Sequence, residues 1–353
     1  MSGIRDVARN AGVSTATVSR VLNGIGEFSA ETRSRVVEAA ARLNYSPDHA
    51  ARNLRRSRPD RAELTYAVGI LQPYSTALQS DPWTGDVLAG IAEALRKRGF
   101  GIRLIACSLD GDVPPEVANH EVDGVISLDG GPLIAKVSAL LPTVTLDNYE
   151  PESGAFGLVP DYRTGVREAA SRLLSAGHRH IALTCADASA PVPAGSLGFA
   201  EQVAAGCLRA YEAAGIALPG NPHAPARGWD SASGYEYGRR VLADPRNRPD
   251  AVIGSDNLLL GVLRAAWELG LRVPQDLSLV GTDGVSLGAF FAPPLTSVDV
   301  RIPLLGEIAT RIVVEAASNG TPRRGVEVTA VGFLERASAR LGPAGALQRE
   351  GTK

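Results

Sequence analysis

Apolar residues in the first 45 positions recur at helical spacing and predict three short helices. Gly12 ends the first helix, because glycine turns readily with positive φ, and Ser14 is a suitable N-cap for a second helix that begins at Thr15. A third helix opens at Ser29. The residues that this pattern buries are Val7, Ala8, Ala11, Val18, Val21, Leu22, Val36, Ala40 and Leu43. A helix, a tight turn, a second helix and a bracing third helix are the layout of a helix-turn-helix.

The second predicted helix leaves a face of small and polar residues uncovered. Arg20 is the one long hydrogen-bonding side chain on that face. Any small three-helix bundle could show this arrangement, but the glycine turn, the cap and an excess of basic residues together favour DNA binding. The other residues of the face are Thr15, Ala16, Ser19 and Asn23.

From about residue 62 the pattern alternates short apolar strands with amphipathic helices, which predicts parallel sheets flanked by helices. The expected strands are 67–71, 102–107, 124–128, 143–147, 180–185, 251–255, 277–281, 295–300 and a final pair within 326–339. The expected helices are 87–98, 162–176, 199–214, 258–269 and one near 303–318. The fold class is therefore a small all-α domain followed by an α/β body.

The composition is that of a soluble globular chain, with 353 residues of which 44% are apolar and 21% charged. No apolar run reaches the ~20 residues of a membrane span, and the first residues lack a signal pattern, so we expect a cytoplasmic protein without membrane contact. Three scattered cysteines fit neither a zinc site nor a disulfide framework. Residues 1–61 carry a net charge of +5 and the remainder −7. This asymmetry suggests that only the basic head contacts a polyanion, and a solubilising basic arm is the alternative interpretation, so charge alone does not decide between them.

Ordered runs of the head resemble the LacI/GalR family of bacterial repressors. They are residues 4–8, 11–14, 16–23 and 29–33, and residues 43–48 followed by 50–55 resemble the short hinge helix of that family. The similarity continues more loosely along nearly the whole chain. It implies a helix-turn-helix DNA-binding domain joined to a two-lobed, periplasmic-binding-protein-like domain, and hence a transcriptional regulator whose operator affinity a small molecule modulates.

The resemblance also implies domain bounds. Residues 1–45 form the helix-turn-helix domain, 46–61 the hinge helix and linker, 62–340 the effector-binding and dimerisation domain, and 341–353 a tail. The chain crosses between the lobes three times, which places about 62–158 and 290–322 in the first lobe and about 159–289 and 323–340 in the second.

Double-stranded operator DNA and a second copy of the chain are the implied macromolecular partners, with a tetramer left open. A helix as short as the hinge is expected to be unstructured without DNA. On DNA, two copies pair and Leu54 wedges into a base step of the minor groove, as it does in the family; a plain flexible linker is the alternative interpretation. The implied DNA-binding residues are Thr15, Ala16, Thr17, Ser19, Arg20, Asn23, Ala51, Leu54 and Arg55.

Ligands of open α/β sheets bind beyond the carboxyl ends of the strands, here between the two lobes. We expect a small-molecule effector there, a sugar or related metabolite, and no cofactor. Simpler interpretations exist for some candidates, since Trp83 and Trp229 could be core residues, Asp256 a helix N-cap and Asp283 a turn former. The candidate effector residues are Tyr74, Ser75, Trp83, Asp147, Trp229, Ser255, Asp256 and Asp283.

Three departures from the family pattern set this chain apart. Val203 occupies the position of an arginine that usually grips the effector, and Gly284 replaces the second acid of an Asp-Asp pair. The segment 108–122 is also short, so one helix is abbreviated to 114–120.

An enzyme or a transport binding protein built on the same body is the alternative function. The chain has no P-loop and no Gly-x-Ser-x-Gly elbow, and His178 and His180 lack a third metal ligand. A transport protein would need an export signal and no basic head. We therefore expect no catalytic residue and no metal site.

Overall fold

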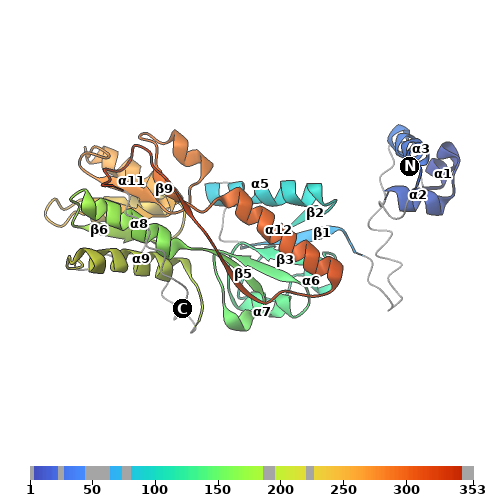
Figure 1. Ribbon diagram of the computed structural model, residues 1–353, viewed down its shortest axis with the longest axis horizontal. Helices are drawn as coiled ribbons and strands as arrows, with labels where there is room; N and C mark the ends of the chain where they lie inside the picture. Colours follow the sequence, from blue (N-terminus) through green and yellow to red (C-terminus); the bar gives the residue numbers. More distant parts are fainter. Residues whose placement is uncertain are drawn as a thin grey trace. The chain divides into compact units, whose positions relative to one another are not determined.

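The computed structural model describes residues 4–22, 28–43, 64–73, 81–185, 195–219 and 226–343. The chain divides into two compact units, Met1–Thr65 and Tyr66–Lys353 (Figure 1). The predicted hinge helix and linker, residues 46–61, lie outside the described residues.

Three helices make up the described part of the first unit: α1 (Ile4–Ala11), α2 (Thr15–Leu22) and α3 (Ala30–Arg42). Gly12 adopts a φ of 65° between the first two. The Oγ of Ser14 accepts a hydrogen bond from the backbone N–H of Thr17 at 3.0 Å, so Ser14 caps α2 as predicted. The core of the unit contains Val7, Ala8, Ala11, Val18, Val21, Val36, Ala39 and Ala40. The expected helix-turn-helix layout is present.

The second unit has two lobes, each built on a sheet flanked by helices. In the described residues the first lobe carries a six-stranded, all-parallel sheet. Its order is β10 (Gly325–Thr329), β5 (Phe156–Pro160), β4 (Thr143–Leu146), β3 (Gly124–Ser127), β1 (Ala67–Pro73) and β2 (Gly101–Cys107). One face is covered by α5 (Pro82–Lys97) and α12 (Ile302–Asn319), and the other by α6 (Pro115–Ala118) and α7 (Pro132–Ser138) (Figure 1).

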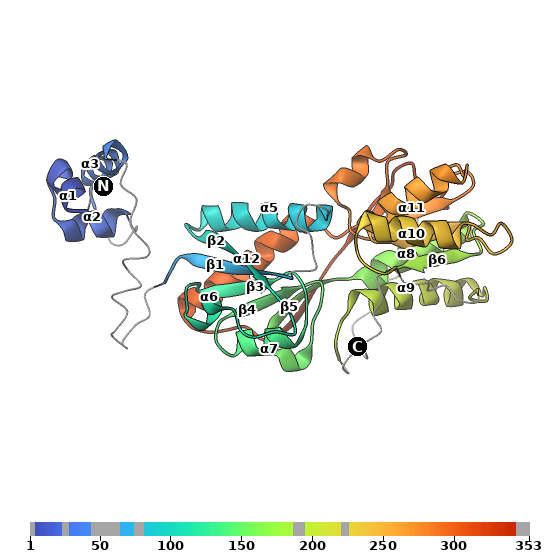
Figure 2. The same ribbon diagram turned by 180° about the vertical axis from the view of Figure 1, so that it is seen from behind.

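The second lobe carries a five-stranded sheet in the described residues, parallel except for its last strand. Its order is β11 (Gly332–Leu334), β9 (Thr296–Asp299), β8 (Ser278–Gly281), β7 (Ala251–Gly254) and β6 (Ile181–Thr184). Figure 2 shows α10 (Ser231–Val241) and α11 (Asp256–Glu268) on one side of the sheet, with α8 (Tyr162–Ser175) and α9 (Phe199–Ala214) on the other. Two 3₁₀ turns complete the described body, η1 (Pro151–Ser153) and η2 (Ser286–Phe290).

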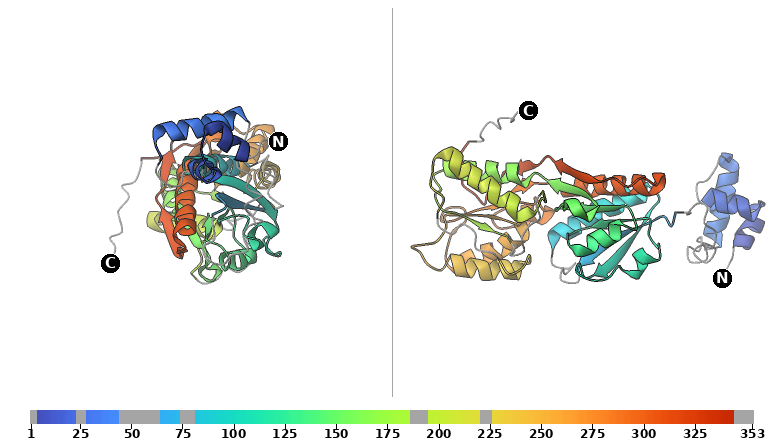
Figure 3. Two further views of the ribbon diagram at one scale, coloured as in Figure 1. Left: turned by 90° about the vertical axis from the view of Figure 1, so that its right-hand side faces the viewer. Right: turned by 90° about the horizontal axis from the view of Figure 1, so that it is seen from below.

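The last two crossings between the lobes lie later in the chain than the sequence suggested. Strand β9 lies in the second sheet beside β8, whereas residues 290–322 were expected in the first lobe. Strand β10 pairs with β5 in the first sheet, although residues 323–340 were expected in the second. The chain passes between the lobes at each of these points, which Figure 3 shows from two further directions. A four- or five-residue strand carries no sequence signal that identifies the strand beside it.

Candidate DNA-binding surface and effector site

The exposed face of α2 presents the residues that the sequence assigned to DNA contact. Thr15, Ala16 and Arg20 are exposed, and Thr17 is half-buried, with its hydroxyl 2.9 Å from the Oγ of Ser14. The guanidinium of Arg20 lies 5.5 Å from the ring centroid of Phe28, close enough for a cation–π contact. The opposite face of α2 packs into the core through Val18 and Val21. The helix therefore offers one polar, solvent-facing side with a single guanidinium on it.

Several predicted residues lie outside the described parts of the chain. They are Asn23, which follows α2 in sequence, Ala51, Leu54 and Arg55 of the predicted hinge helix, and Tyr74 and Ser75, which follow β1 in sequence. Ser19 lies on α2, but its side chain is not among those described.

Three of the predicted effector residues meet at the carboxyl end of the second sheet. Asp283 follows β8 and its carboxylate receives three hydrogen bonds, from the Oγ of Ser255 (2.9 Å), the N–H of Asp256 (2.8 Å) and the Oγ1 of Thr282 (2.9 Å). Burial, and next the charge of Asp256, raise the pKa of the Asp283 carboxyl well above its ordinary value. An acid in this position can accept a hydrogen bond from a hydroxyl or amine group of a ligand.

Asp256 is fully buried and holds the turn that carries Asp283. Its carboxylate accepts from the N–H of Asp283 (3.2 Å), the N–H of Val285 (3.0 Å) and the Oγ of Ser297 (2.8 Å). Its side chain does not cap α11, of which Asp256 is the first residue and Ser255 the N-cap. The role we derive for Asp256 is to fix the geometry of its neighbours.

A second group of predicted residues follows the first sheet. Asp147 comes directly after β4 in the left-handed region, with a φ of 65°. Its Oδ1 accepts a hydrogen bond at 2.9 Å from the Oη of Tyr162, the first residue of α8. Burial, with a smaller contribution from the charges of Asp129 and Asp81, raises the pKa of Asp147 to about 7 against the lowering effect of this bond. Ionisation of the Asp147 carboxyl is therefore unfavourable in this environment.

An aromatic row connects this acid to Trp229. The rings of Tyr162 and Phe199 lie 4.8 Å apart in an edge contact, and those of Phe199 and Trp229 lie 5.4 Å apart. The backbone carbonyl of Trp229 accepts from the Nδ2 of Asn257 at 3.0 Å. With 48% of its surface exposed, Trp229 is not a core residue. The row thus ends in a solvent-facing indole.

Trp83 lies in the first turn of α5, the helix capped by Asp81. The carboxylate of Asp81 accepts from the backbone N–H groups of Trp83 and Thr84, both at 3.2 Å. The indole of Trp83 is half-buried, and among the described residues its Nε1 has no hydrogen-bond partner. An unpaired buried N–H is unfavourable unless a water or ligand oxygen accepts it.

Val203 is fully buried on α9 and places no cation near the aromatic row. Gly206, one turn further, lies so close to α8 that a Cβ there would be 2.5 Å from the carbonyl oxygen of Arg163. Sequence reasoning missed two residues of this region, Tyr162 and Phe199. Each begins a helix, and the position of Tyr162 after strand β5 would have indicated it had that strand been recognised.

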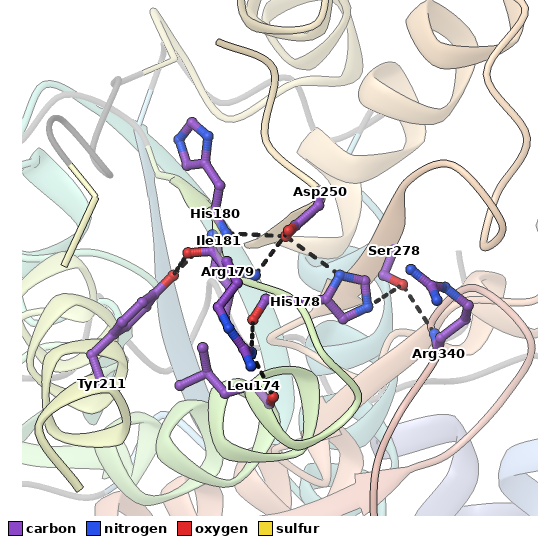
Figure 4. Close-up of polar contacts among 9 residues, drawn as sticks. All are labelled: Leu174, His178, Arg179, His180, Ile181, Tyr211, Asp250, Ser278 and Arg340. Atoms are coloured by element: carbon purple, nitrogen blue, oxygen red, sulfur yellow. Dashed lines mark hydrogen bonds and ion pairs between the residues drawn. The ribbon is translucent and has the colours of Figure 1, made fainter. Parts of the chain in front are cut away.

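A Ser–His–Asp set occupies the opposite edge of the second sheet (Figure 4). The Nδ1 of His178 lies 3.4 Å from Oδ1 of Asp250, and its Nε2 lies 3.1 Å from the Oγ of Ser278. The Asp250 carboxylate also accepts from the N–H groups of Arg179 (2.8 Å) and His180 (3.2 Å). Because Ser278 is fully buried, its hydroxyl has no access to a substrate, and the set joins the amino ends of β6, β7 and β8.

Within the described ranges, no three His, Cys, Asp or Glu side chains are grouped so that they could hold a metal ion. Among the helices of the same ranges, none combines the length and apolar character that crossing a membrane requires.

Two family models match this sequence. One, described as bacterial regulatory proteins of the lacI family, covers residues 3–48, and the other, a periplasmic binding protein-like domain, covers residues 170–339. The curated relatives include the ribose operon repressor of Escherichia coli (strain K12), which is 30% identical over 96% of this chain and 100% of its own length. The transcriptional repressor PurR of Mannheimia succiniciproducens is 30% identical over 92% of this chain and 94% of its own length.

Solved structures with the same architecture include the lac repressor dimer bound to operator and the anti-inducer ONPF. It is 25% identical, covers 96% of this chain and 98% of its own, and superposes with a TM-score of 0.71. The complex of the transcriptional regulator CelR with cellobiose is 26% identical over 96% of this chain and 100% of its own, with a TM-score of 0.65.

Proposed function

This chain belongs to the lacI family of bacterial regulatory proteins and is a DNA-binding transcriptional repressor, and from that premise we propose which side chains read its operator and which bind its effector. The proposal for DNA contact rests on the exposed face of α2. Thr15, Ala16 and Arg20 lie on this face, and the other face of the helix is buried. A helix of this form enters the major groove, where arginine pairs with the edge of guanine.

The test of this assignment compares two arginines of the head. An operator is first selected from a random duplex pool, and its affinity is then measured for the parent, Arg20→Ala and Arg35→Ala. Arg35 is exposed on α3, so its loss removes the same charge from a different helix. We expect Arg20→Ala to cost about 1–3 kcal/mol on the operator and far less on random DNA. Equal losses for both variants on both DNAs would show that Arg20 contributes only charge.

For the effector we propose a site between the lobes, with Trp83 and Asp147 from the first lobe facing Trp229, Ser255 and Asp283 from the second. Tyr74 and Ser75 belong to the same proposal through their place after β1. Support comes from the buried acid at the end of β8, the exposed indole of Trp229 and the unpaired Nε1 of Trp83, which together offer acceptors, a stacking face and a donor.

The ligand class that fits these groups is a small polyhydroxylated molecule, such as a sugar. The relatives include a ribose operon repressor, and the CelR structure holds cellobiose. Because Val203 offers no charge to an anionic group, we expect neutral sugars to bind in preference to their phosphates or acids. A thermal-shift screen over sugars, nucleosides and sugar acids identifies the ligand, and DNA-release assays with each hit determine the direction of the response.

We propose that the chain acts as a homodimer, like the lac repressor dimer that it resembles in fold. Strand β2 is an edge of the first sheet in the described residues and exposes Ile102 (41%) and Leu104 (48%). Exposed apolar residues on an edge strand favour an interface. We expect Leu104→Asp to lower the molar mass measured by light scattering. Leu140→Asp, at an equally exposed leucine after α7, is the control and should leave the mass unchanged.

A further inference from the structure

A polar contact joins the two lobes at a place that the proposed effector residues do not include. Asp86 on α5 of the first lobe accepts two hydrogen bonds from Ser286 at the start of η2 in the second lobe. The backbone N–H of Ser286 donates to Oδ2 at 2.8 Å and its Oγ donates to Oδ1 at 2.9 Å, across 200 positions of sequence. We call this pair the interlobe clasp.

The Ser286 end of the clasp is rigidly tied to the turn that carries Asp283. Buried Asp256 accepts the N–H groups of both Asp283 and Val285, and the N–H of Gly284 donates to the Oγ of Ser297 at 3.0 Å. Every backbone N–H from Asp283 to Val285 is therefore fixed to the second lobe, through α11 or β9. Ser286 is the next residue, so it moves with Asp283 as one piece.

The Asp86 end of the clasp is rigidly linked to Trp83, because both residues lie on α5, one helical turn apart. This helix is packed tightly on α12, because a Cβ on Gly90 would lie 2.6 Å from the carbonyl oxygen of Pro303. On the facing helix, a Cβ on Gly306 would lie 2.9 Å from the carbonyl oxygen of Val87. Each half of the clasp thus lies three residues after a proposed effector contact, Trp83 on one side and Asp283 on the other.

The clasp can open without separating the lobes elsewhere. Ser286 is exposed and Asp86 is half-buried, so water can replace both hydrogen bonds. A second connection, a backbone pair between Tyr149 after β4 and Leu197 before α9, has N–H···O distances of 3.0 and 2.9 Å. This pair and the crossing segments keep the lobes joined when the clasp breaks, which allows a change of angle between them.

We propose that the clasp between Asp86 and Ser286 holds the two lobes in the arrangement described above, and that an effector which changes this arrangement must break it. The second half rests on the proposed effector site between Trp83 and Asp283. Asp86 and Ser286 are positioning residues, since they act on the lobes and are not among the proposed effector contacts. A ligand shifts a conformational equilibrium only through its different affinities for the two states, so loss of the clasp should reproduce part of the effector's action.

The first test uses Trp83 as the only tryptophan, after Trp229→Phe and Trp267→Phe. Quenching of its fluorescence by acrylamide is measured in the full-length protein without DNA or effector. In this background we expect Asp86→Ala to raise the quenching constant at least about twofold, because the clasped and open arrangements then become comparably populated. Ser286→Ala keeps the backbone N–H and should have a smaller effect. The double variant should equal Asp86→Ala, because both residues act through one contact.

Glu93→Ala is the matched control, since Glu93 lies on the same helix but pairs with Arg96 within it. Asp86→Asn keeps one acceptor oxygen, and its quenching constant should be intermediate if the charge of Asp86 contributes to the clasp. This variant replaces Asp86→Ala if circular dichroism shows that the alanine variant is unfolded. A quenching constant in the Asp86 variants equal to that of the parent and of Glu93→Ala overturns the proposal.

The second test is operator affinity, measured with the same variants carrying native tryptophans and with no effector. We expect the Asp86 variants to shift affinity several-fold while Glu93→Ala leaves it unchanged. Faster quenching of Trp83 combined with unaltered operator affinity would show that the clasp is not coupled to DNA binding, and it would overturn the regulatory half. Neither result bears on the DNA reading by Arg20 or on which residues bind the effector, so those proposals stand or fall separately.

Discussion

Asp147 allows a sharp test of the idea that the proposed effector site lowers the stability of the protein. Asp147→Asn removes the charge, keeps an oxygen that can accept from the Oη of Tyr162, and suits the φ of 65°, which asparagine tolerates well. Burial raises the pKa of this carboxyl from 3.8 to about 7. The folded state therefore holds a proton that the unfolded chain has released, and stability falls as the pH rises from about 4 to about 7.

The size of the effect follows from the pKa difference. At about 1.4 kcal/mol for each pKa unit, the full penalty above pH 7 would be about 4 kcal/mol. The side chain is half-buried, and solvent reduces the penalty, so we expect Asp147→Asn to gain about 2 kcal/mol at pH 8 and almost nothing at pH 4. Between these limits the gain should grow with pH and level off above pH 7.

Urea unfolding followed by tryptophan fluorescence measures this gain, since Trp83, Trp229 and Trp267 all lie in the second unit. Asp110→Asn, at an exposed carboxylate of the same lobe, is the control and should change stability little at any pH. A gain that does not vary with pH, or a loss of stability in Asp147→Asn at pH 8, would refute the reasoning. A confirmed gain would mark Asp147 as an acid kept for binding at the expense of folding.

Three further predictions concern other parts of the molecule. Asp283→Ala should abolish the thermal shift caused by the effector and leave operator binding in its absence nearly intact, and a surviving shift would place the site elsewhere. Leu54→Ala should reduce operator bending and specific affinity in a gel-based bending assay while binding to random duplex barely changes, because charge sets the latter. Gly261→Ala should lower the free energy of unfolding by more than about 2 kcal/mol, since its Cβ would lie 2.0 Å from the carbonyl oxygen of Ser231; an unaltered urea midpoint would contradict this packing.

Local patterns made the head readable from sequence. The turn at Gly12, the cap at Ser14 and the buried spacing of Val18 and Val21 lie within a few residues of one another, and the structure has each as expected. The fold class of the body was equally accessible, because alternation of strands and helices is repeated along the chain. The pairing of β9 and β10 was not, since it depends on contacts between residues far apart in sequence.

The hydrophobic pattern did not predict helices α7 and α10 or strand β5, and for α10 and β5 the structure shows the reason. Helix α10 packs on α11 through glycines, and a Cβ on Gly234 would lie 2.0 Å from the carbonyl oxygen of Leu258, so close packing replaces the large apolar stripe that predicts a helix. Strand β5 is short, ends at Pro160 and follows the turn of η1. Because β5 was not predicted, the sequence did not indicate that Tyr162 follows a strand end. The aromatic row that begins at Tyr162 was therefore missed.

The exchange of C-terminal strands between the lobes has a consequence for how the protein is made. The head draws its core from residues 4–43 alone, so it can fold as soon as that segment leaves the ribosome. The body cannot, because β5 waits for β10 at residues 325–329 and β8 waits for β9 at residues 296–299. Until then β5 and β8, which lie inside the finished sheets, are edge strands that can pair with another chain. We therefore expect a nascent chain that is cut short before residue 325 to have a folded DNA-binding head and an incompletely folded body. Such a chain could still bind DNA, so we expect the cell to remove it by rapid degradation.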